Sequence, residues 1–444
     1  MEKSAFSRRH LLASAAALGI AALSGRAFAA VMLDAAELGA IPGPDDQTGA
    51  LQKAFDTAAA QARPLFLPPG TYRVTGLIVP DGLQLTGMPG QTILALSGGD
   101  TLLSISGRSN VTIQGIAFDG SGGGTGSAQS GLIDVQNSRA VTLTNLSLRN
   151  AAGNGLALFA SEGLVENCDI AEVSTAIFAL DNTGLVITSN RIAHCRNNGI
   201  LVWRSASGAD GTIVTGNRIA DVAFEAGGNG QNGNGINVFR AGEIIVANNH
   251  ITGCAFSAVR LNATTNTQVT GNACIDSGET AIFSEFGFSG SVIANNVIDK
   301  AALGISIANL DSEGHLATCS GNIVRNILPS SPNNPDTTPC GIFAEADVAI
   351  TGNVVDSVPG PGILAGWGPF LRNVLVNGNV VRNTQIGIAA SVAEGAGSAQ
   401  ITGNTISGAE TPLAGMAWTE MRSGDLAADA GRFANVSVAG NAVS

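Results

Sequence analysis

Residues 296–307 read NVIDKAALGISI, and this pattern decides the fold. The asparagine is followed by a short apolar piece, Val297-Ile298, and a second piece begins at Gly304, eight residues after Asn296. A third piece leads into the next asparagine, as residues 184–187 do before Asn190. Each piece alternates apolar with polar or small residues and is bounded by Gly, Asn, Asp or Ser, which predicts three short strands per unit.

The unit recurs along most of the chain. Its asparagines are Asn145, Asn167, Asn190, Asn217, Asn249, Asn272, Asn296, Asn322, Asn353, Asn379, Asn404 and Asn441. Most intervals lie between 22 residues (145 to 167) and 27 residues (190 to 217), and the longer ones indicate inserted loops. A fixed period without helical stretches is typical of a solenoid. We therefore predict an all-β, three-sheet parallel β-helix whose stacked asparagines bond turn amides from coil to coil.

The first residues have a different character. A basic pair, Arg8-Arg9, precedes an apolar segment that runs to about Ser24, and Ala27-Phe28-Ala29 is typical of a cleavage site. This pattern predicts a cleaved twin-arginine signal peptide over residues 1–29, export by the twin-arginine translocase and a periplasmic or secreted mature protein. The apolar segment is too short to span a membrane, so we expect no membrane span in the mature form.

The charge of the chain limits its partners. The net charge is −12, and the signal contributes +3 from four basic residues and one acidic residue, which leaves −15 for the mature chain. Such a surface repels nucleic acids and anionic membranes. We expect no nucleic-acid partner, and an acidic ligand would need a local basic patch.

Six cysteines in an exported chain raise the question of disulfides. Cys195 and Cys254 occupy equivalent positions two coils apart, about 9.6 Å at a strand spacing of about 4.8 Å, which is too far for a bridge. Cys319 and Cys340 flank an inserted segment and are left as a candidate pair. The sequence shows no metal-ligand spacing.

Residues 30–80 differ from the repeats. The segment from Asp45 to Ala60 has an acidic start and the apolar spacing of one amphipathic helix, and residues 65–74 indicate two strands around a Pro-Pro-Gly turn. We predict a helical cap with the first strands over residues 30–80 and β-helix coils over residues 81–444, within one folded unit.

The run from Leu38-Gly39-Ala40 through this helix to residues 67–72, LPPGTY, resembles the opening of the pectate-lyase-like superfamily. The resemblance implies a right-handed parallel β-helix with a short N-terminal α-helical cap. With the twin-arginine leader, the chain also resembles an uncharacterised group of twin-arginine-translocated repeat proteins. The superfamily includes polysaccharide lyases, glycoside hydrolases, uronan epimerases, phage tailspikes and adhesive proteins. The Gly-His-Gly segment of its polygalacturonases and the Asp-Pro-His-Glu run of its alginate epimerases are absent.

One face of the solenoid collects the residues that could carry chemistry. Alternation on the second strand of each unit places its first and third apolar residues inside and the intervening residues outside. On or just past these strands we predict four catalytic residues: Arg240, Arg260, Glu285 and Glu345. We predict seven substrate-binding residues: Trp203, Arg204, Asn237, Phe239, Asn262, Asn309 and Trp367. Two inserted segments, Asp221–Asn234 and Pro329–Pro339, leave before the second strand and are expected to wall this face.

Two chemistries fit these residues. Glu285 and Glu345 lie two coils apart, hence about 9.6 Å, near the upper end of the carboxylate separation in inverting glycosidases. Alternatively, Arg204, Arg240 and Arg260 would neutralise the carboxylate of a uronic acid and acidify its C5 proton for elimination or epimerisation. Lyases of the superfamily often use calcium as a clamp, and Asp311 and Glu285 could supply oxygen ligands. His250 points outward on another face, and we interpret it as a surface residue.

The sequence therefore favours an exported carbohydrate-active β-helix protein that acts on a polysaccharide as a lyase, epimerase or hydrolase. Aromatic rings beside polar groups on a ridged surface suit a sugar chain. The alternative is a non-catalytic glycan-binding or cell-envelope structural protein. If Arg260 is an exposed outward residue, Arg260→Ala should change stability by no more than about 0.5 kcal/mol.

Overall fold

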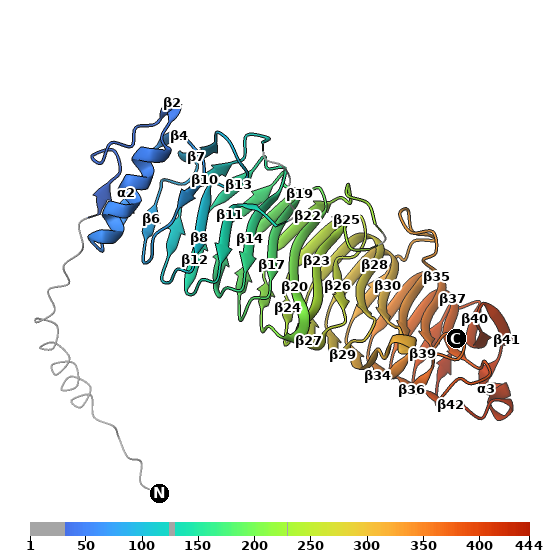
Figure 1. Cartoon of the computed structure of the whole chain (residues 1–444). Coiled ribbons are helices and arrows are strands. Elements are labelled where there is room, and N and C mark those ends of the chain that lie inside the picture. The colour runs from blue at the N-terminus through green and yellow to red at the C-terminus, as the bar shows by residue number, and fades with distance from the viewer. Residues whose placement is uncertain (1–31, 124–128, 229) are drawn as a thin grey trace, which may run out of the picture.

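The computed structural model describes residues 32–123, 129–228 and 230–444, and the predicted signal peptide lies outside these ranges. The described chain forms one elongated solenoid of stacked coils (Figure 1). Strands of successive coils pair in parallel at each of three positions, so three sheets run along the molecule. The prediction of an all-β, three-sheet parallel β-helix is confirmed.

Each sheet collects one strand, or part of one, from nearly every coil. The first sheet contains β2 (Gly43–Asp46), β4 (Gly70–Val74), β7 (Thr92–Leu96), β10 (Ala117–Asp119), β13 (Ser147–Arg149), β16 (Asp169–Ala171), β19 (Arg191–Cys195), β22 (Arg218–Val222), β25 (His250–Cys254), β28 (Ala273–Glu285), β30 (Val297–Ile307), β32 (Ile323–Arg325), β35 (Val354–Ala365), β37 (Val380–Ser391), β39 (Thr405–Ser407) and β43 (Ala442–Val443). The second sheet contains β5 (Leu77–Ile78), β8 (Leu103–Ser106), β11 (Gly131–Gln136), β14 (Asn154–Phe159), β17 (Thr175–Leu180), β20 (Asn198–Ala209), β23 (Asn234–Gly242), β26 (Val259–Asn262), the C-terminal parts of β28 and β30, β33 (Cys340–Ala344), the C-terminal parts of β35 and β37, and β40 (Thr411–Ala417). The third sheet contains β1 (Leu33–Asp34), β3 (Leu65–Phe66), β6 (Gln84–Thr86), β9 (Thr112–Gln114), β12 (Val141–Thr144), β15 (Gly163–Glu166), β18 (Val186–Thr188), β21 (Ile213–Thr215), β24 (Ile245–Ala247), β27 (Thr265–Thr270), β29 (Ser289–Ala294), β31 (His315–Ser320), β34 (Ala346–Thr351), β36 (Arg372–Asn377), β38 (Ala399–Thr402) and β42 (Val436–Ala439).

The core lies between the three sheets. Alternate residues of each strand point inward, and on the second sheet Ile200 and Val202 stack on Ile236 and Val238 of the next coil. These aliphatic side chains are fully buried in a core that runs the length of the solenoid. The intervening residues of the same strands therefore form the outer face of the second sheet, as the alternation predicted.

A ladder of asparagines runs from Asn190 to Asn441, and all of its rungs except Asn441 are buried. At a typical rung, the Asn272 Nδ2 donates to the Asn296 Oδ1 at 3.0 Å, and that oxygen also accepts from the Asn272 backbone N at 2.9 Å. The Asn272 Nδ2 also donates to the Val246 carbonyl at 3.0 Å. The ladder thus satisfies turn amides from coil to coil without water, as predicted.

Asn145 and Asn167 do not belong to this ladder, and their assignment to it was wrong. Both are exposed and have positive φ angles of 53° and 52°. In Gly-Asn and Asn-Asn pairs the first residue takes this left-handed turn position and the second is the buried rung. Asn145 and Asn167 occupy the first position, and in the latter coil Cys168 fills the rung and donates its backbone N to Asn190.

The two ends of the solenoid are covered differently. The helix α2 (Thr48–Ala60) lies across the first coils at the N-terminal end and buries Leu51, Ala54, Phe55 and Ala58 (Figure 1). At the other end, β40 and β41 (Glu420–Ser423) form an antiparallel hairpin, followed by α3 (Leu426–Asp429) and η2 (Ala430–Arg432). Leu426 of α3 is fully buried against the last coils. The predicted N-terminal helical cap is confirmed.

All six cysteines are buried and free. Cys319 is in the central core, whereas Cys340 belongs to a separate apolar cluster with Leu364 and Ile386 on the outer face of the second sheet. The candidate pair Cys319–Cys340 is therefore wrong, because its members lie on opposite sides of that sheet. Burial raises the pKa of both thiols to about 12.

None of the helices in the described ranges has the length and hydrophobicity of a membrane span.

Candidate functional site

The outer face of the second sheet carries two rows of side chains, fixed by the coil-to-coil register. One row reads Leu201, Asn237, Arg260, Phe283, Ser306, Phe343 and Leu364. The other includes Trp203, Phe239, Asn262 and Glu285, and Glu345 follows in a later coil. The sequence therefore placed these residues on the correct face. It did not predict which of them the inserted segments cover.

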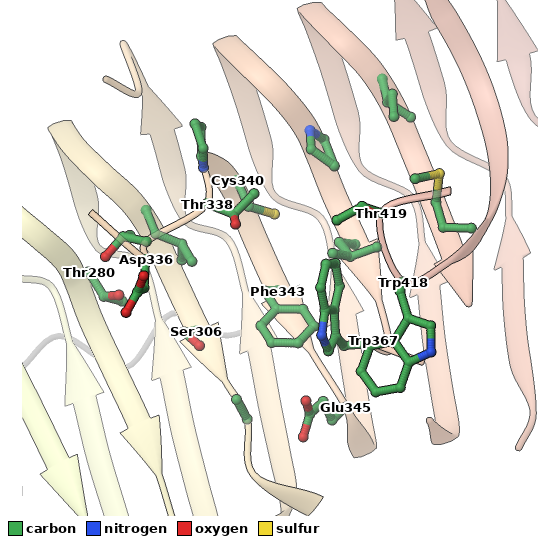
Figure 2. A pocket seen from close by; sticks show the side chains of 18 of the residues that line it. Thr280, Ser306, Asp336, Thr338, Cys340, Phe343, Glu345, Trp367, Trp418 and Thr419 are labelled. Atoms are coloured by element: carbon green, nitrogen blue, oxygen red, sulfur yellow. The ribbon is translucent and has the colours of Figure 1, made fainter. Parts of the chain in front are cut away.

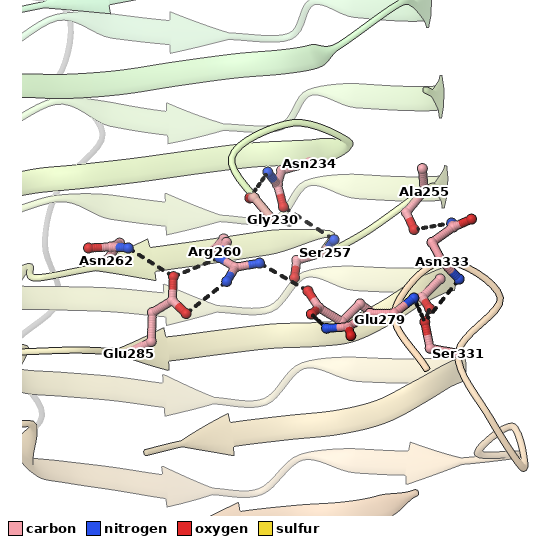
Figure 3. Close-up of polar contacts among 12 residues, drawn as sticks. Gly230, Asn234, Ala255, Ser257, Arg260, Asn262, Glu279, Glu285, Ser331 and Asn333 are labelled. Atoms are coloured by element: carbon pink, nitrogen blue, oxygen red, sulfur yellow. Dashed lines mark hydrogen bonds and ion pairs between the residues drawn. The ribbon is translucent and has the colours of Figure 1, made fainter. Parts of the chain in front are cut away.

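Arg260 is the centre of a closed ion-pair cluster (Figure 3). Its Nε and Nη2 donate to the two carboxylate oxygens of Glu285 at 2.7 and 2.8 Å. Its Nη1 donates to Glu279 at 3.0 Å, while Asn262 donates to Glu285 at 3.0 Å. Asn334 of the second inserted segment donates to the other oxygen of Glu279 at 2.7 Å. Every charged oxygen and nitrogen of the cluster thus has a partner.

The cluster is buried, although its side chains point away from the core. Arg260, Glu285 and Glu279 are only 8%, 2% and 4% exposed. The first inserted segment lies over the guanidinium so closely that a Cβ at Gly230 would overlap it. The expectation of an exposed Arg260 was therefore wrong. Burial alone would lower the pKa of Arg260, but the bonds and charges of Glu285 and Glu279 raise it.

The three arginines predicted to bind a uronate do not converge. Arg204 donates to the Asn182 carbonyl at 3.3 Å and lies 3.9 Å from Asp210. Arg240 is exposed, donates to the Ser205 carbonyl at 3.1 Å and packs over the Phe239 ring at 4.6 Å. Because Arg260 is held by two carboxylates, no basic patch forms from these residues.

A row of aromatic rings occupies the same face on the N-terminal side of the cluster. Phe159, Phe178, Trp203 and Phe239 meet edge to face, with ring centroids 5.5, 5.6 and 5.8 Å apart. The Trp203 Nε1 donates to the Asn237 Oδ1 at 3.2 Å, and Asn237 is buried. The predicted binding residues Trp203, Asn237 and Phe239 thus largely pack on neighbouring side chains of this row and cover the sheet.

A cavity of about 840 Å³ opens on the C-terminal side of the cluster (Figure 2). Its floor is the outer face of the second sheet, and its walls are the second inserted segment and the β40–β41 hairpin. Of the predicted site residues, Asn309, Glu345 and Trp367 line it. Phe343, Trp367 and Trp418 supply aromatic surface, and Thr280, Ser306, Thr338 and Gln385 supply polar groups. This size and composition are typical of a ligand-binding pocket.

Glu345 is the titratable group that distinguishes this cavity. It is 6% exposed, and burial raises its pKa from 4.5 to about 7, against the effect of hydrogen bonds from the Leu310 and Asn309 backbones. The Leu310 N donates to its Oε2 at 2.7 Å. Leu310 begins η1 (Leu310–Ser312), where Asn309 has a left-handed φ of 73°. Near neutral pH this carboxyl group is therefore divided between its acidic and its ionised forms.

The cavity wall that carries Trp418 has an unusual backbone. Trp418 lies at the tip of the hairpin, where Ala417 pairs with Glu420, and its φ is 56°. A bulky residue is uncommon at such an angle, although Phe286 and Leu316 of this chain adopt it too, with φ angles of 57° and 66°. Its ring packs edge to face on Trp367 at 5.8 Å, and a Cβ at Gly368 would overlap the ring.

Charge in the cavity is of one sign. Its carboxyl groups belong to Glu279, Asp336, Glu345 and Glu410. None of the described residues that line it is a lysine, an arginine or a histidine. Asp336 and Glu410 are exposed, whereas Glu279 is buried and bound to Arg260 at the edge of the cavity.

Calcium does not fit the ligands expected for it. Both oxygens of Glu285 are engaged by Arg260 and Asn262, and Asp311 is an exposed residue of η1. Over the described ranges, no group of three or more His, Cys, Asp or Glu side chains is arranged to hold a metal ion.

Sequence reasoning missed Glu279, Asp336 and Trp418. Glu279 precedes the part of β28 that joins the second sheet, and its role depends on contacts with Arg260, nineteen positions earlier, and with Asn334 of the second inserted segment. Asp336 belongs to an inserted segment with no repeat to place it. Trp418 had one usable signal, because the chain contains only three tryptophans.

The stacked parallel coils define a β-helix protein, and its handedness follows from sequence comparison. The family model described as "Right handed beta helix region" matches residues 101–230 and 163–320. Over these residues the chain is similar to right-handed parallel β-helix proteins, in agreement with its stacked parallel coils. The predicted resemblance to the right-handed parallel β-helix superfamily is confirmed, whereas the resemblance to twin-arginine-translocated repeat proteins stays a prediction. The search of curated proteins found no matching sequence.

Several solved structures are similar along most of the chain. The A-module of a mannuronan C-5 epimerase from Azotobacter vinelandii is 18% identical, with coverage of 93% of this chain and 99% of that chain and a TM-score of 0.49. The catalytic unit of an α-1,3-glucanase from Streptomyces thermodiastaticus is 17% identical, with coverage of 94% and 69% and a TM-score of 0.48. A surface adhesin of Streptococcus pneumoniae is 13% identical, with coverage of 93% and 91% and a TM-score of 0.45. Similarities this distant carry no argument about activity.

Proposed function

We propose that the cavity binds a carbohydrate chain and that the protein is a polysaccharide hydrolase with Glu345 as its proton donor. One observation carries the proposal: a buried carboxyl group with a pKa of about 7 lies in a cavity lined by Phe343, Trp367 and Trp418. Aromatic rings pack on the apolar faces of pyranoses, and polar groups such as Ser306 and Gln385 hold hydroxyls.

Hydrolysis requires an acid that protonates the leaving oxygen and a base that activates water. A carboxyl group with a pKa near the working pH suits the acid, because it is protonated yet transfers its proton readily. Glu345 meets this requirement. We assign no base, because Asp336 and Glu410, the exposed carboxylates of the cavity, precede the second-sheet strands β33 and β40, whereas Glu345 follows β33 at the other end of the floor; we assign these two residues to substrate binding. Glu285, the partner expected from the sequence, is instead bound to Arg260 and does not line the cavity.

A uronate lyase or epimerase is less well supported. Such chemistry needs a cation beside the substrate carboxylate, and Arg204, Arg240 and Arg260 neither converge nor line the cavity. Export by the twin-arginine translocase and a periplasmic or secreted location remain part of the proposal, since they rest on residues 1–29.

A non-catalytic glycan-binding protein is the second candidate. The observation that favours it is the bond from the Leu310 N to Glu345, because this bond gives the carboxyl group a structural role in holding η1. Both candidates bind a glycan, but only the hydrolase cleaves it.

The test is incubation with neutral glucans, amino-sugar polymers and polyuronates, followed by reducing ends and by absorbance of unsaturated ends. A hydrolase releases reducing ends without unsaturated ones, and Glu345→Gln should lower kcat about 100-fold or more, the usual contribution of a general acid. Because the acid must be protonated, kcat should fall as the pH rises through about 7. Glu37→Gln, at an exposed carboxylate of the N-terminal cap, is the matched control.

Binding without turnover in the wild type would leave the second candidate. Release of unsaturated ends from a polyuronate would instead contradict the hydrolase. Trp418→Ala should weaken glycan binding in either case.

A further inference from the structure

We propose that the glycan bound in this cavity carries protonated amino groups, so that the substrate class is a polymer of amino sugars with free amines. The inference rests on the proposed function of the cavity as a carbohydrate site. It adds the charge of the ligand, which nothing in the fold decides.

The first step is the charge of the walls. Asp336 and Glu410 are exposed at the cavity, and Glu345 lies buried in it. Next to the cavity, Glu279 and Glu285 share the single cation Arg260, so this cluster also has an excess negative charge. With no basic residue among the described residues that line the cavity, its field attracts cations and repels carboxylates.

The second step is the position of these carboxyl groups. Asp336 and Glu410 precede the second-sheet strands β33 and β40, whereas Glu345 follows β33. The five steps from Cys340 to Glu345 span about 16 Å at a rise of about 3.3 Å per residue. Negative groups therefore stand at both ends of a floor that is aromatic between them (Figure 2). A ligand with several amines spaced along a chain matches this arrangement better than a single small cation.

The third step is the aromatic surface. Phe343, Trp367 and Trp418 attract cations over their ring faces and pack on the C–H faces of pyranoses. An amino sugar presents both a cation and an apolar ring face. A neutral sugar lacks the cation, a uronate has the opposite charge, and a cationic peptide lacks the pyranose face.

Isothermal titration of the full protein with four hexamers tests the inference: glucosamine, N-acetylglucosamine, galacturonic acid and lysine. We expect the glucosamine hexamer to bind at least about tenfold more tightly than its N-acetylated counterpart, and the galacturonic acid hexamer to show no measurable binding. Higher salt should reduce the difference, because exposed charges are screened. The lysine hexamer, with charge but no pyranose, should bind more weakly than the glucosamine hexamer.

Variants separate this inference from the proposed function. The double variant Asp336→Asn with Glu410→Gln should lose most of the preference for the glucosamine hexamer and retain binding of the N-acetylated one. Glu37→Gln should leave both affinities unchanged. Equal affinity for the two hexamers in the wild type, or tighter binding of the uronate or of the lysine hexamer, overturns the inference and leaves other glycans possible. Failure of all sugars to bind, here and in the wider glycan panel, overturns both proposals.

Discussion

Glu285 and Glu345 lie in nearly the same local sequence and have opposite environments. Each follows an Ile-Phe-x segment of the second sheet, residues 282–284 and 342–344. Glu285 forms a bidentate pair with Arg260 from the preceding coil, whereas Glu345 has no basic partner among the residues that the structure describes, and its pKa rises to about 7. The coil before Glu345 presents Ser306 and Ala308 instead of Arg260 and Asn262. In a solenoid, the chemistry of a position is therefore set by its neighbours in adjacent coils.

The largest effect on the free energy of unfolding should come from removing Arg260, the cation that neutralises Glu285. Arg260→Ala leaves Glu285 and Glu279 buried without a cation, and loss of one partner from a buried ion pair costs about 3–5 kcal/mol. The measurement is the free energy of unfolding from denaturant titration. Arg240→Ala, at an exposed arginine, is the control and should change it by no more than about 0.5 kcal/mol. Equal small changes in both variants would contradict the structure of the cluster.

The contribution of Glu345 to the free energy of unfolding should depend on pH. A rise in the pKa of Glu345 from 4.5 to about 7 on folding corresponds to about 3 kcal/mol. Because the folded-state pKa is raised, this stability is fully present below pH 4.5 and is lost as the pH rises through about 7. The difference in unfolding free energy between the wild type and Glu345→Gln should therefore shift by about 3 kcal/mol, against the wild type, between pH 4 and 8. A difference that does not change with pH would show that Glu345 titrates normally.

The first inserted segment covers Arg260, and two of its glycines test this contact. Gly230 and Gly227 both have positive φ angles, 107° and 71°, but only a Cβ at Gly230 would meet the guanidinium. Gly227→Ala should cost about 1 kcal/mol from backbone strain alone. Gly230→Ala should cost a further 1–3 kcal/mol or so, because the segment must move off the ion pair. Equal unfolding free energies for the two variants would mean that this segment does not cover Arg260.

The smallest effect should come from Asn262→Ala. This change removes one hydrogen bond of 3.0 Å to Glu285 and leaves the bidentate pair with Arg260 intact. The expected loss is about 1 kcal/mol, the usual net contribution of a hydrogen bond. A loss as large as that of Arg260→Ala, in the same denaturant titration, would show that Glu285 does not depend mainly on Arg260 as its partner.

The sequence by itself determined the coil, the three strands per unit, the inward and outward alternation and the N-terminal cap. These features are local or periodic. Residue pairs such as Gly216-Asn217, and the alternation seen at Ile200-Leu201-Val202, repeat in coil after coil. Even here, Asn145 and Asn167 show that the repeat is read correctly only when the second residue of each pair is checked.

Only the tertiary structure decided which outward residues face water. Arg260 and Glu285 stand in the predicted rows, yet residues of two inserted segments, Gly230 and Asn334, bury and complete their cluster. The cavity likewise depends on Trp418 from the C-terminal hairpin. The physical reason is that a period specifies where a side chain starts and in which direction it points. Its burial, charge partner and pKa depend on loops and coils that are distant in sequence, and no periodic signal encodes their packing.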